Sequence, residues 1–215
     1  MIVAIDGPAG AGKSTVAKLV ASSLGLRFLD SGAMYRAVTL EVLRRGLDPA
    51  RAEDCARVAA SLKLDFDAQG KLSIDGRPGE PDIRGREVTS HVSAVSAHAG
   101  VRTGLVELQR SLAASWGGLV AEGRDMTSVV FPHAEHKFFL IASSLERARR
   151  RALELGTPAA AERIREELER RDRLDSTRDL APLVCPPDAR VIDTDGKSVD
   201  EVVACLLAHV RGACA

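Results

Sequence analysis

Eight residues near the N-terminus, Gly7 to Ser14, have the types and spacing needed to bind a phosphate. Their sequence, Gly-Pro-Ala-Gly-Ala-Gly-Lys-Ser, fits the pattern G-x-x-x-x-G-K-[ST] and directly follows the apolar run at residues 2–5. Glycines let the backbone turn tightly so that its N–H groups converge, while Lys13 adds a positive charge and Ser14 a hydroxyl for Mg²⁺. A helix beginning near Lys13 would point its positive dipole end at the same anion. A tight turn without a ligand is the alternative, and we favour a nucleotide-phosphate site formed by Gly7, Pro8, Ala9, Gly10, Ala11, Gly12, Lys13, Ser14 and Thr15.

Charged and hydroxyl side chains follow two further predicted strands. Ser31 and Arg36 come after the strand predicted at 27–30, and Glu122, Arg124 and Asp125 follow the buried pattern at 119–122. Ligands of open parallel sheets bind at the carboxyl ends of the strands, so these side chains are candidates for a shared site. Strand packing requires neither Arg124 nor Asp125, whereas phosphoryl transfer requires cations for phosphate oxygens and carboxylates for metal or substrate.

Some of these residues also have a structural interpretation. Ser31 could simply cap a helix, and Arg36 could lie on the surface. Glu122 is well placed to order the water of a bound Mg²⁺, but it could equally hold the phosphate-binding loop.

A third charged group contains Arg171, Asp175 and Arg178 and follows a predicted helical region. Arginines on a mobile helical segment can close over a transferring phosphoryl group, neutralise its oxygens and exclude water. An ordinary charged helix end would look the same in the sequence. Most charges of the preceding helix are expected to form solvated i,i+4 pairs.

Composition limits the class of protein. The chain has 215 residues, is 45% hydrophobic, and balances 30 basic against 30 acidic side chains, which fits a soluble globular domain. Without a net positive charge we expect no nucleic-acid polymer and no anionic membrane as partner, and we expect a cytoplasmic monomer. The dispersed cysteines predict reduced thiols without a zinc site or a disulfide framework: Cys55, Cys185, Cys205 and Cys214.

The hydrophobic patterns predict an α/β fold with a five-stranded parallel sheet and helices on both faces. Helical patterns cover 13–24, 33–45, a segment after Pro49, 87–98, 101–115, 144–178 and 199–210, and buried strands cover 119–122, 137–141 and 191–193. Alternation at 62–81 instead predicts an antiparallel hairpin outside the main sheet. We therefore expect one domain with a core (1–61, 118–143 and 181–215), an inserted lobe at 62–117 and a helical lid at 144–180.

Matching segments run along nearly the whole chain and resemble the bacterial cytidylate kinases, which belong to the P-loop nucleoside monophosphate kinases. The most specific are Leu29-Asp30-Ser31-Gly32-Ala33-Met34-Tyr35-Arg36, Glu122-Gly123-Arg124-Asp125-Met126, and Arg171-Asp172 with Asp175, Arg178 and Ala181-Pro182-Leu183. The resemblance implies transfer of a phosphoryl group from ATP, with Mg²⁺ at Ser14 and Glu122, to CMP or dCMP.

The resemblance also implies roles for individual residues. Ser31 and Asp175 would bind the ribose hydroxyls; Arg36, Arg124 and Arg178 the acceptor phosphate; and Ser93, Arg102 and Asp125 the cytosine edge. Arg171 would be a lid arginine beside the donor phosphates, and Lys13, Arg124, Arg171 and Arg178 would carry the catalysis. A carboxylate, a guanidinium and a hydroxyl complement the donor and acceptors of cytosine. Ser93 could instead cap or pack within its helix, as Ser90 and Ser96 lie nearby.

The chain departs from the family pattern at two places. Thr127-Ser128 stands where Gly-Thr is usual, and His133 replaces a common acid. Thr127 adds a side chain at a backbone turn that we expect beside the substrate, whereas His133 is given no catalytic role.

Three other functions are possible for a phosphate-binding loop. Another small-molecule kinase, for UMP, dTMP, AMP or shikimate, would share the loop and differ at Arg102 and Asp125. A GTPase switch would need Asn-Lys-x-Asp, which the sequence lacks, and the Asp-x-x-Gly matches at Asp67 and Asp193 lie in the wrong context. An ATPase that drives a partner would turn over ATP without an acceptor.

Overall fold

A five-stranded sheet forms the centre of the fold. The computed structural model describes residues 1–212, so Cys214 lies outside the described residues. The strands follow the order β2-β6-β1-β7-β8, and β1–β7 and β7–β8 are parallel pairs. This confirms the predicted sheet, whose strands are β1 (Ile2–Asp6), β2 (Arg27–Asp30), β6 (Leu119–Glu122), β7 (His136–Ile141) and β8 (Arg190–Asp193).

Contacts between residues divide the chain into two compact units. The first unit contains Met1–Leu26 and the chain from Val120 onward, and the second contains Arg27–Leu119.

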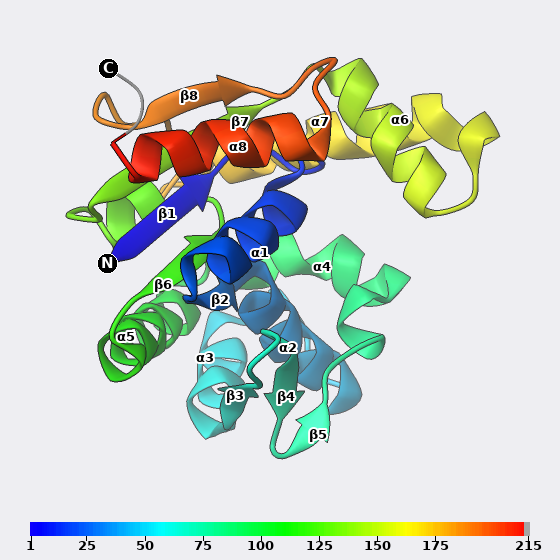
Figure 1. The fold of residues 1–215 in the computed structure, drawn as a ribbon. Helices are drawn as coiled ribbons and strands as arrows, with labels where there is room; N and C mark the ends of the chain where they lie inside the picture. The colour runs from blue at the N-terminus through cyan, green and yellow to red at the C-terminus, as the bar shows by residue number, and fades with distance from the viewer. Residues whose placement is uncertain (213–215) are drawn as a thin grey trace. The chain divides into compact units, whose positions relative to one another are not determined.

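The first unit is built on β1 and β7, which are in register from Val3 opposite His136 to Asp6 opposite Phe139. Val3, Ala4 and Ile5 have no exposed surface, as expected of a strand buried on both faces. In Figure 1, helix α8 lies in front of β7. The helices of this unit are α1 (Lys13–Leu24), α6 (Ser144–Glu154), α7 (Ala161–Thr177) and α8 (Val199–Val210), with a short 3-10 turn, η3 (Pro158–Ala160), and a five-residue π-helical turn, η2 (Met126–Val130).

The predicted helical region 144–178 is two helices rather than one. Helix α6 ends at Glu154, and Gly156 then adopts a positive φ of 64° that few other residues tolerate. The 3-10 turn η3 then begins at Pro158, and α7 follows it. Charged residues dominate both sides of the break, but residues 155–161 carry no charge, so Gly156 and Pro158 were the available signal for it.

The second unit is mostly helical and contains the small antiparallel sheet. The hairpin predicted at 62–81 is present, with Leu64 opposite Ile74, and a third short strand extends it. The elements are α2 (Ser31–Arg44), α3 (Ala52–Ser61), β3 (Leu64–Phe66), β4 (Leu72–Ile74), β5 (Arg77–Pro78), η1 (Asp82–Arg84), α4 (Arg86–Ala97) and α5 (Ala99–Trp116).

Helix α2 begins earlier than the predicted residue 33. Its N-cap is Asp30, whose carboxylate accepts a hydrogen bond of 2.9 Å from the Ala33 amide. The alternative in which Ser31 caps this helix is therefore wrong, and Ser31 is instead the first helical residue, with its side chain buried.

The cysteines differ in exposure, since Cys55 is buried, Cys205 is half-buried and Cys185 is exposed. No helix in residues 1–212 combines the length and the apolar character needed to cross a membrane.

Candidate active site

The phosphate-binding loop joins β1 to α1 and depends on its first glycine. Gly7 has a φ of 146°, and a Cβ atom there would lie 2.1 Å from the carbonyl oxygen of Leu140 on β7. A side chain at this position would therefore displace the loop from the sheet. Gly12, the N-cap of α1, has a φ of 86°, which turns the loop into the helix.

Lys13 is buried at the start of α1. Its Nζ donates a hydrogen bond of 2.8 Å to the carbonyl of Pro8, so the side chain curls back over the loop. Burial, together with the neighbouring charge of Arg124, lowers the pKa of Lys13 to about 7, while Glu122 and Asp6 oppose the shift. An anion beside Lys13 would restore its charge.

Ser14 and Glu122 bring two oxygen ligands to the same place. The Ser14 hydroxyl donates a hydrogen bond of 2.6 Å to Oε1 of Glu122, which lies at the end of β6. Mg²⁺ prefers oxygen ligands and usually takes one or two from the protein, with waters and substrate phosphates completing its shell. The pair fits that need, and no cluster of three metal-binding side chains (His, Cys, Asp or Glu) occurs within residues 1–212.

Three arginines and two aspartates lie together, two of them just after β6 and three on the last turns and C-cap of α7. Nε of Arg124 donates to Oδ2 of Asp175 at 2.9 Å, and Nε of Arg171 lies 3.9 Å from the same oxygen. Nη2 of Arg178 lies 3.9 Å from Oδ1 of Asp125. The structure thus brings together Arg124, Asp125, Arg171, Asp175 and Arg178, which the sequence places in two segments about fifty residues apart.

The charges of this group affect one another. Burial and the charge of Arg124 lower the pKa of Arg171 to about 10. Burial would also lower the pKa of Arg124, but the carboxylates of Asp175 and Glu122 more than offset it, so that its pKa is raised. Arg124 therefore keeps its full charge and repels both Lys13 and Arg171.

The remaining predicted substrate residues belong to the second unit. Arg36 is buried, and its Nη1 donates to the carbonyl of Ile83 at 3.1 Å and to Oγ1 of Thr89 at 2.9 Å. The interpretation of Arg36 as a surface residue is therefore wrong. Asp30 at the N-terminus of the same helix pairs with Arg84 at 2.8 Å.

Arg102 and Ser93 lie on α5 and α4. Arg102 is buried and donates to the carbonyl of Ser96 at 3.3 Å, and its guanidinium lies 5.6 Å from the centre of the Tyr35 ring. Ser93 is half-buried, and its carbonyl accepts a hydrogen bond of 3.0 Å from Ser96.

Asp6, at the end of β1, was not predicted as a site residue. It is fully buried and accepts hydrogen bonds from the amides of Met126 and Thr127, at 3.0 and 2.7 Å, and from the Thr127 hydroxyl at 2.6 Å. Burial raises the pKa of Asp6, and the donors of Thr127 and Met126 counteract the shift. Thr127, one of the departures from the family pattern, thus has a structural role that supports the Arg124–Asp125 segment.

Replacing Thr127 by valine is expected to lower the free energy of unfolding by about 1.5–3 kcal/mol, because it removes a donor to a buried carboxylate while keeping the volume. Urea denaturation of the variant and the wild type measures this difference. Thr127→Ser, which keeps the hydroxyl, is the matched control and should lose less. Equal losses in the two variants would mean that the methyl packing of Thr127, and not its hydrogen bond, is what matters.

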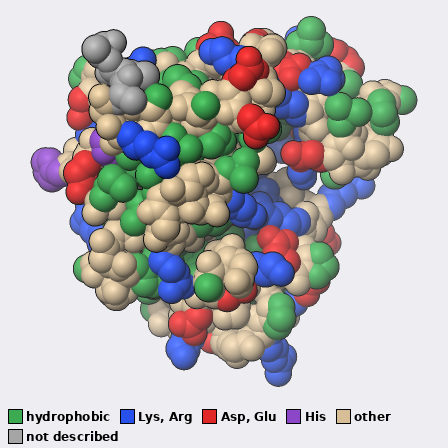
Figure 2. Space-filling view, viewed as in Figure 1, with side chains coloured by type: hydrophobic (Ala, Val, Ile, Leu, Met, Phe, Trp, Pro, Cys, Tyr) green, Lys and Arg blue, Asp and Glu red, His purple; other side chains and the backbone are tan. Residues whose placement is uncertain are grey.

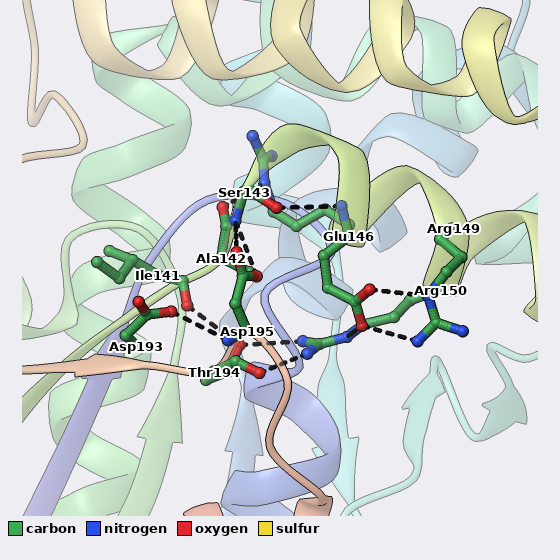
Figure 3. Close-up of polar contacts among 10 residues, drawn as sticks. Ile141, Ala142, Ser143, Glu146, Arg149, Arg150, Asp193, Thr194 and Asp195 are labelled. Atoms are coloured by element: carbon green, nitrogen blue, oxygen red, sulfur yellow. Dashed lines mark hydrogen bonds and ion pairs between the residues drawn. The ribbon is translucent and has the colours of Figure 1, made fainter.

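Helix α6 is fixed at its N-terminus by a polar network that the sequence analysis also missed (Figure 3). The amide of Ser143 donates to both carboxylate oxygens of Asp195, at 3.0 and 3.1 Å. Arg150 donates to Oγ1 and the carbonyl of Thr194, at 3.0 and 2.6 Å, and to Glu146 at 2.8 Å. The Ser-x-x-Glu spacing of Ser143 and Glu146 was the available signal for this helix start.

The outer surfaces of α6 and α7 carry charges of both signs, as Figure 2 shows at the right of the view. The expected i,i+4 pairs include Arg165 with Glu169, and Arg165 also forms an i,i+3 pair with Glu162. Exposed pairs of this kind contribute little to stability.

Known proteins similar to this chain are mostly kinases. The sequence model described as cytidylate kinase matches residues 3–212. The chain is 46% identical to the cytidylate kinase of Mycobacterium avium (strain 104), over 98% of this chain and 95% of that protein. It is 47% identical to the cytidylate kinase of Pelotomaculum thermopropionicum, over 97% and 95% of the two chains.

Solved structures with lower identity share the fold. TT1252 from Thermus thermophilus is 21% identical, with a TM-score of 0.52 over 100% of this chain and 98% of that one. The shikimate kinase of Acinetobacter baumannii is 16% identical, with a TM-score of 0.51 over 99% and 94%. The family match over residues 3–212 and the two relatives at 46% and 47% identity show that the chain belongs to the cytidylate kinase family.

Proposed function

We propose that the protein transfers the γ-phosphoryl group of ATP to the 5′-phosphate of CMP or dCMP. The observation that carries this proposal is the convergence of Lys13, Arg124 and Arg171, close enough for Arg124 to lower the pKa of the other two. Cations that repel one another in such a site are stabilised when a polyanion binds beside them. Polyphosphates are polyanions of this kind, and phosphoryl transfer develops negative charge on their oxygens.

Catalysis requires positioning and charge neutralisation rather than a covalent nucleophile. The loop amides and Lys13 bind the donor phosphates, and Arg124, Arg171 and Arg178 neutralise the oxygens of the group in transit. Ser14 and Glu122 would hold Mg²⁺, which would supply positive charge to offset that of the donor phosphates. In this proposal Glu122 has both roles that the sequence suggested: it helps to hold Mg²⁺, and its hydrogen bond with Ser14 holds the phosphate-binding loop.

The acceptor is bound by side chains that can complement its three parts. In this proposal Ser31 and Asp175 bind the ribose, and Arg36, Arg124 and Arg178 bind the phosphate. Ser93, Arg102 and Asp125 recognise cytosine. The burial of Arg36, Arg102 and Asp125 supports a selective role, because buried polar groups penalise a ligand that leaves them unpaired.

The functional division of the chain is also a proposal. We infer a core, a monophosphate-binding insert at 62–117 and a lid at 144–180 that closes on substrate, in a cytoplasmic monomer without nucleic-acid or membrane partners. The break between α6 and α7 at Gly156 and Pro158 supports movement at the outer end of this segment, while the start of α6 and Asp172 of α7 stay attached.

A survey of phosphoryl acceptors tests the substrate assignment. A coupled assay with CMP, dCMP, UMP, dTMP, AMP and shikimate should give the highest kcat/KM with CMP or dCMP. ATP turnover at the full rate without any acceptor would instead identify an ATPase.

Asp125→Ala is expected to reduce the preference for CMP over UMP by at least about 10-fold, because a buried acceptor for the cytosine amino group is lost. The ratio of kcat/KM values for the two acceptors measures this preference and is insensitive to the fraction of folded enzyme. Asp179→Ala, at an exposed aspartate, is the control and should leave the ratio unchanged. Cytosine selectivity that survives Asp125→Ala would contradict our account of base recognition.

A further inference from the structure

Ala9 of the phosphate-binding loop lies in a closed ring of hydrogen bonds with two charged side chains. Its amide donates to Oδ1 of Asp172 on α7 at 3.2 Å. Its carbonyl accepts from Nη1 of Arg147 on α6 at 2.9 Å, and the same Nη1 donates to Oδ2 of Asp172 at 2.5 Å. Both polar groups of one loop peptide residue are therefore held by an ion pair between two helices.

This ion pair is poorly exposed and well satisfied. The side chains of Arg147 and Asp172 are 7% and 18% exposed, and Nε of Arg147 also donates to the carbonyl of Ala142 at 3.1 Å. Burying two charges costs as much as their attraction returns, so such a pair is poorly explained as a source of stability alone. Its geometric effect is clearer, because a planar guanidinium with several partners fixes the positions of all of them.

The N-terminus of helix α6 is held by contacts that do not involve the phosphate-binding loop. The position of Arg147 therefore does not depend on its contact with Ala9. The network of Ser143, Asp195, Arg150 and Thr194 in Figure 3 secures the first two turns of the helix. Gly10 allows α6 to approach, since a Cβ atom at Gly10 would lie 3.1 Å from Cβ of Arg147. The loop is thus packed directly on a fixed helix.

The ring also determines the register of α7 against the loop. Arg171 directly precedes Asp172 on α7 and is half-buried, with its Nε 3.9 Å from Oδ2 of Asp175. Its charge is one of those that lower the pKa of Lys13, so it lies within electrostatic reach of the loop lysine. A shift of Asp172 relative to Ala9 would move Arg171 relative to Lys13.

We propose that Arg147 and Asp172 are positioning residues, here called the loop clamp, which hold the Ala9 peptide and thereby place Arg171 against the donor phosphates. The inference rests on the proposed role of Arg171 in phosphoryl transfer. The clamp touches no reacting atom and acts on the reaction only through the loop and Arg171.

The test combines Asp172→Asn with Arg171→Ala. Asp172→Asn should lower kcat by at least about 10-fold and change the KM for CMP by less than about 2-fold. The reason is that a displaced Arg171 stabilises the transition state less but does not affect the binding of the acceptor. In the Arg171→Ala background, Asp172→Asn should reduce kcat no further, because the side chain it positions is gone. Full kcat in Asp172→Asn, or effects that multiply in the double variant, would overturn the proposal.

Controls separate positioning from loss of structure. Glu162→Gln makes the same charge change at an exposed site on α7 and should leave kcat unchanged. Thermal melts of each variant must show folded protein at the assay temperature, and Arg147→Lys, which keeps the charge but loses the planar fork, should reproduce the defect of Asp172→Asn.

A result in which Arg171→Ala retains wild-type kcat would refute the proposed role of Arg171 and not, by itself, the clamp. The dissociation constant of Mg·ATP then decides. Asp172→Asn should still weaken Mg·ATP binding by at least about 5-fold, because the loop that binds the phosphates is no longer fixed. An unchanged dissociation constant would overturn the clamp as well.

Discussion

Replacing Lys13 by methionine is expected to lower kcat/KM by at least about 100-fold, because the variant loses a buried charge that stabilises the donor phosphates in the transition state. The methionine keeps most of the volume of the lysine stem, so the loop should retain its shape. Steady-state assays with saturating CMP and varied ATP measure the effect. Near-wild-type activity would remove Lys13 from the catalytic assignment.

The pH dependence of ATP binding gives a second readout of the same variant. Because the pKa of Lys13 is lowered to about 7, part of the unliganded protein has a neutral lysine at neutral pH. A bound polyphosphate favours the charged form, so ATP binding takes up protons and its affinity falls as the pH rises through 7. Calorimetry in buffers of different ionisation enthalpy should detect this uptake in the wild type and not in Lys13→Met.

The phosphate-binding loop could be predicted because its signal is local. Gly7, Lys13 and Ser14 lie within eight residues, and each is required by the conformation or charge of the same short turn. The strands could be predicted for a similar reason, since runs such as 2–5 and 119–122 are apolar enough to be buried on both faces.

The supporting residues could not be predicted, because their partners are far away in the sequence. Asp6 meets Thr127 across 121 positions, and Ala9 meets Asp172 across 163. An isolated aspartate at a strand end, or one more charge in a helix rich in Arg and Glu, has no local pattern that marks it. Family resemblance supplied roles for Arg171 and Asp175, but it assigned none to Asp172 between them.

Arg124→Ala is expected to lower kcat/KM by at least about 100-fold, through loss of a half-buried cation that keeps its charge. The structure gives this arginine a central place, because it pairs with Asp175 at 2.9 Å and acts electrostatically on both Lys13 and Arg171. Arg163→Ala, at an exposed arginine of α7, is the matched control for the loss of one positive charge and should retain activity.

An electrostatic role for Arg124 has a consequence that general damage to the fold would not produce. Since the charge of Arg124 lowers the pKa of Lys13, its removal should raise that pKa. The pH above which ATP affinity falls should therefore move upward from about 7 in Arg124→Ala, while it stays in place in Arg163→Ala. A midpoint that does not move, in a variant that is folded and inactive, would show that Arg124 acts on the acceptor without being coupled to the donor lysine.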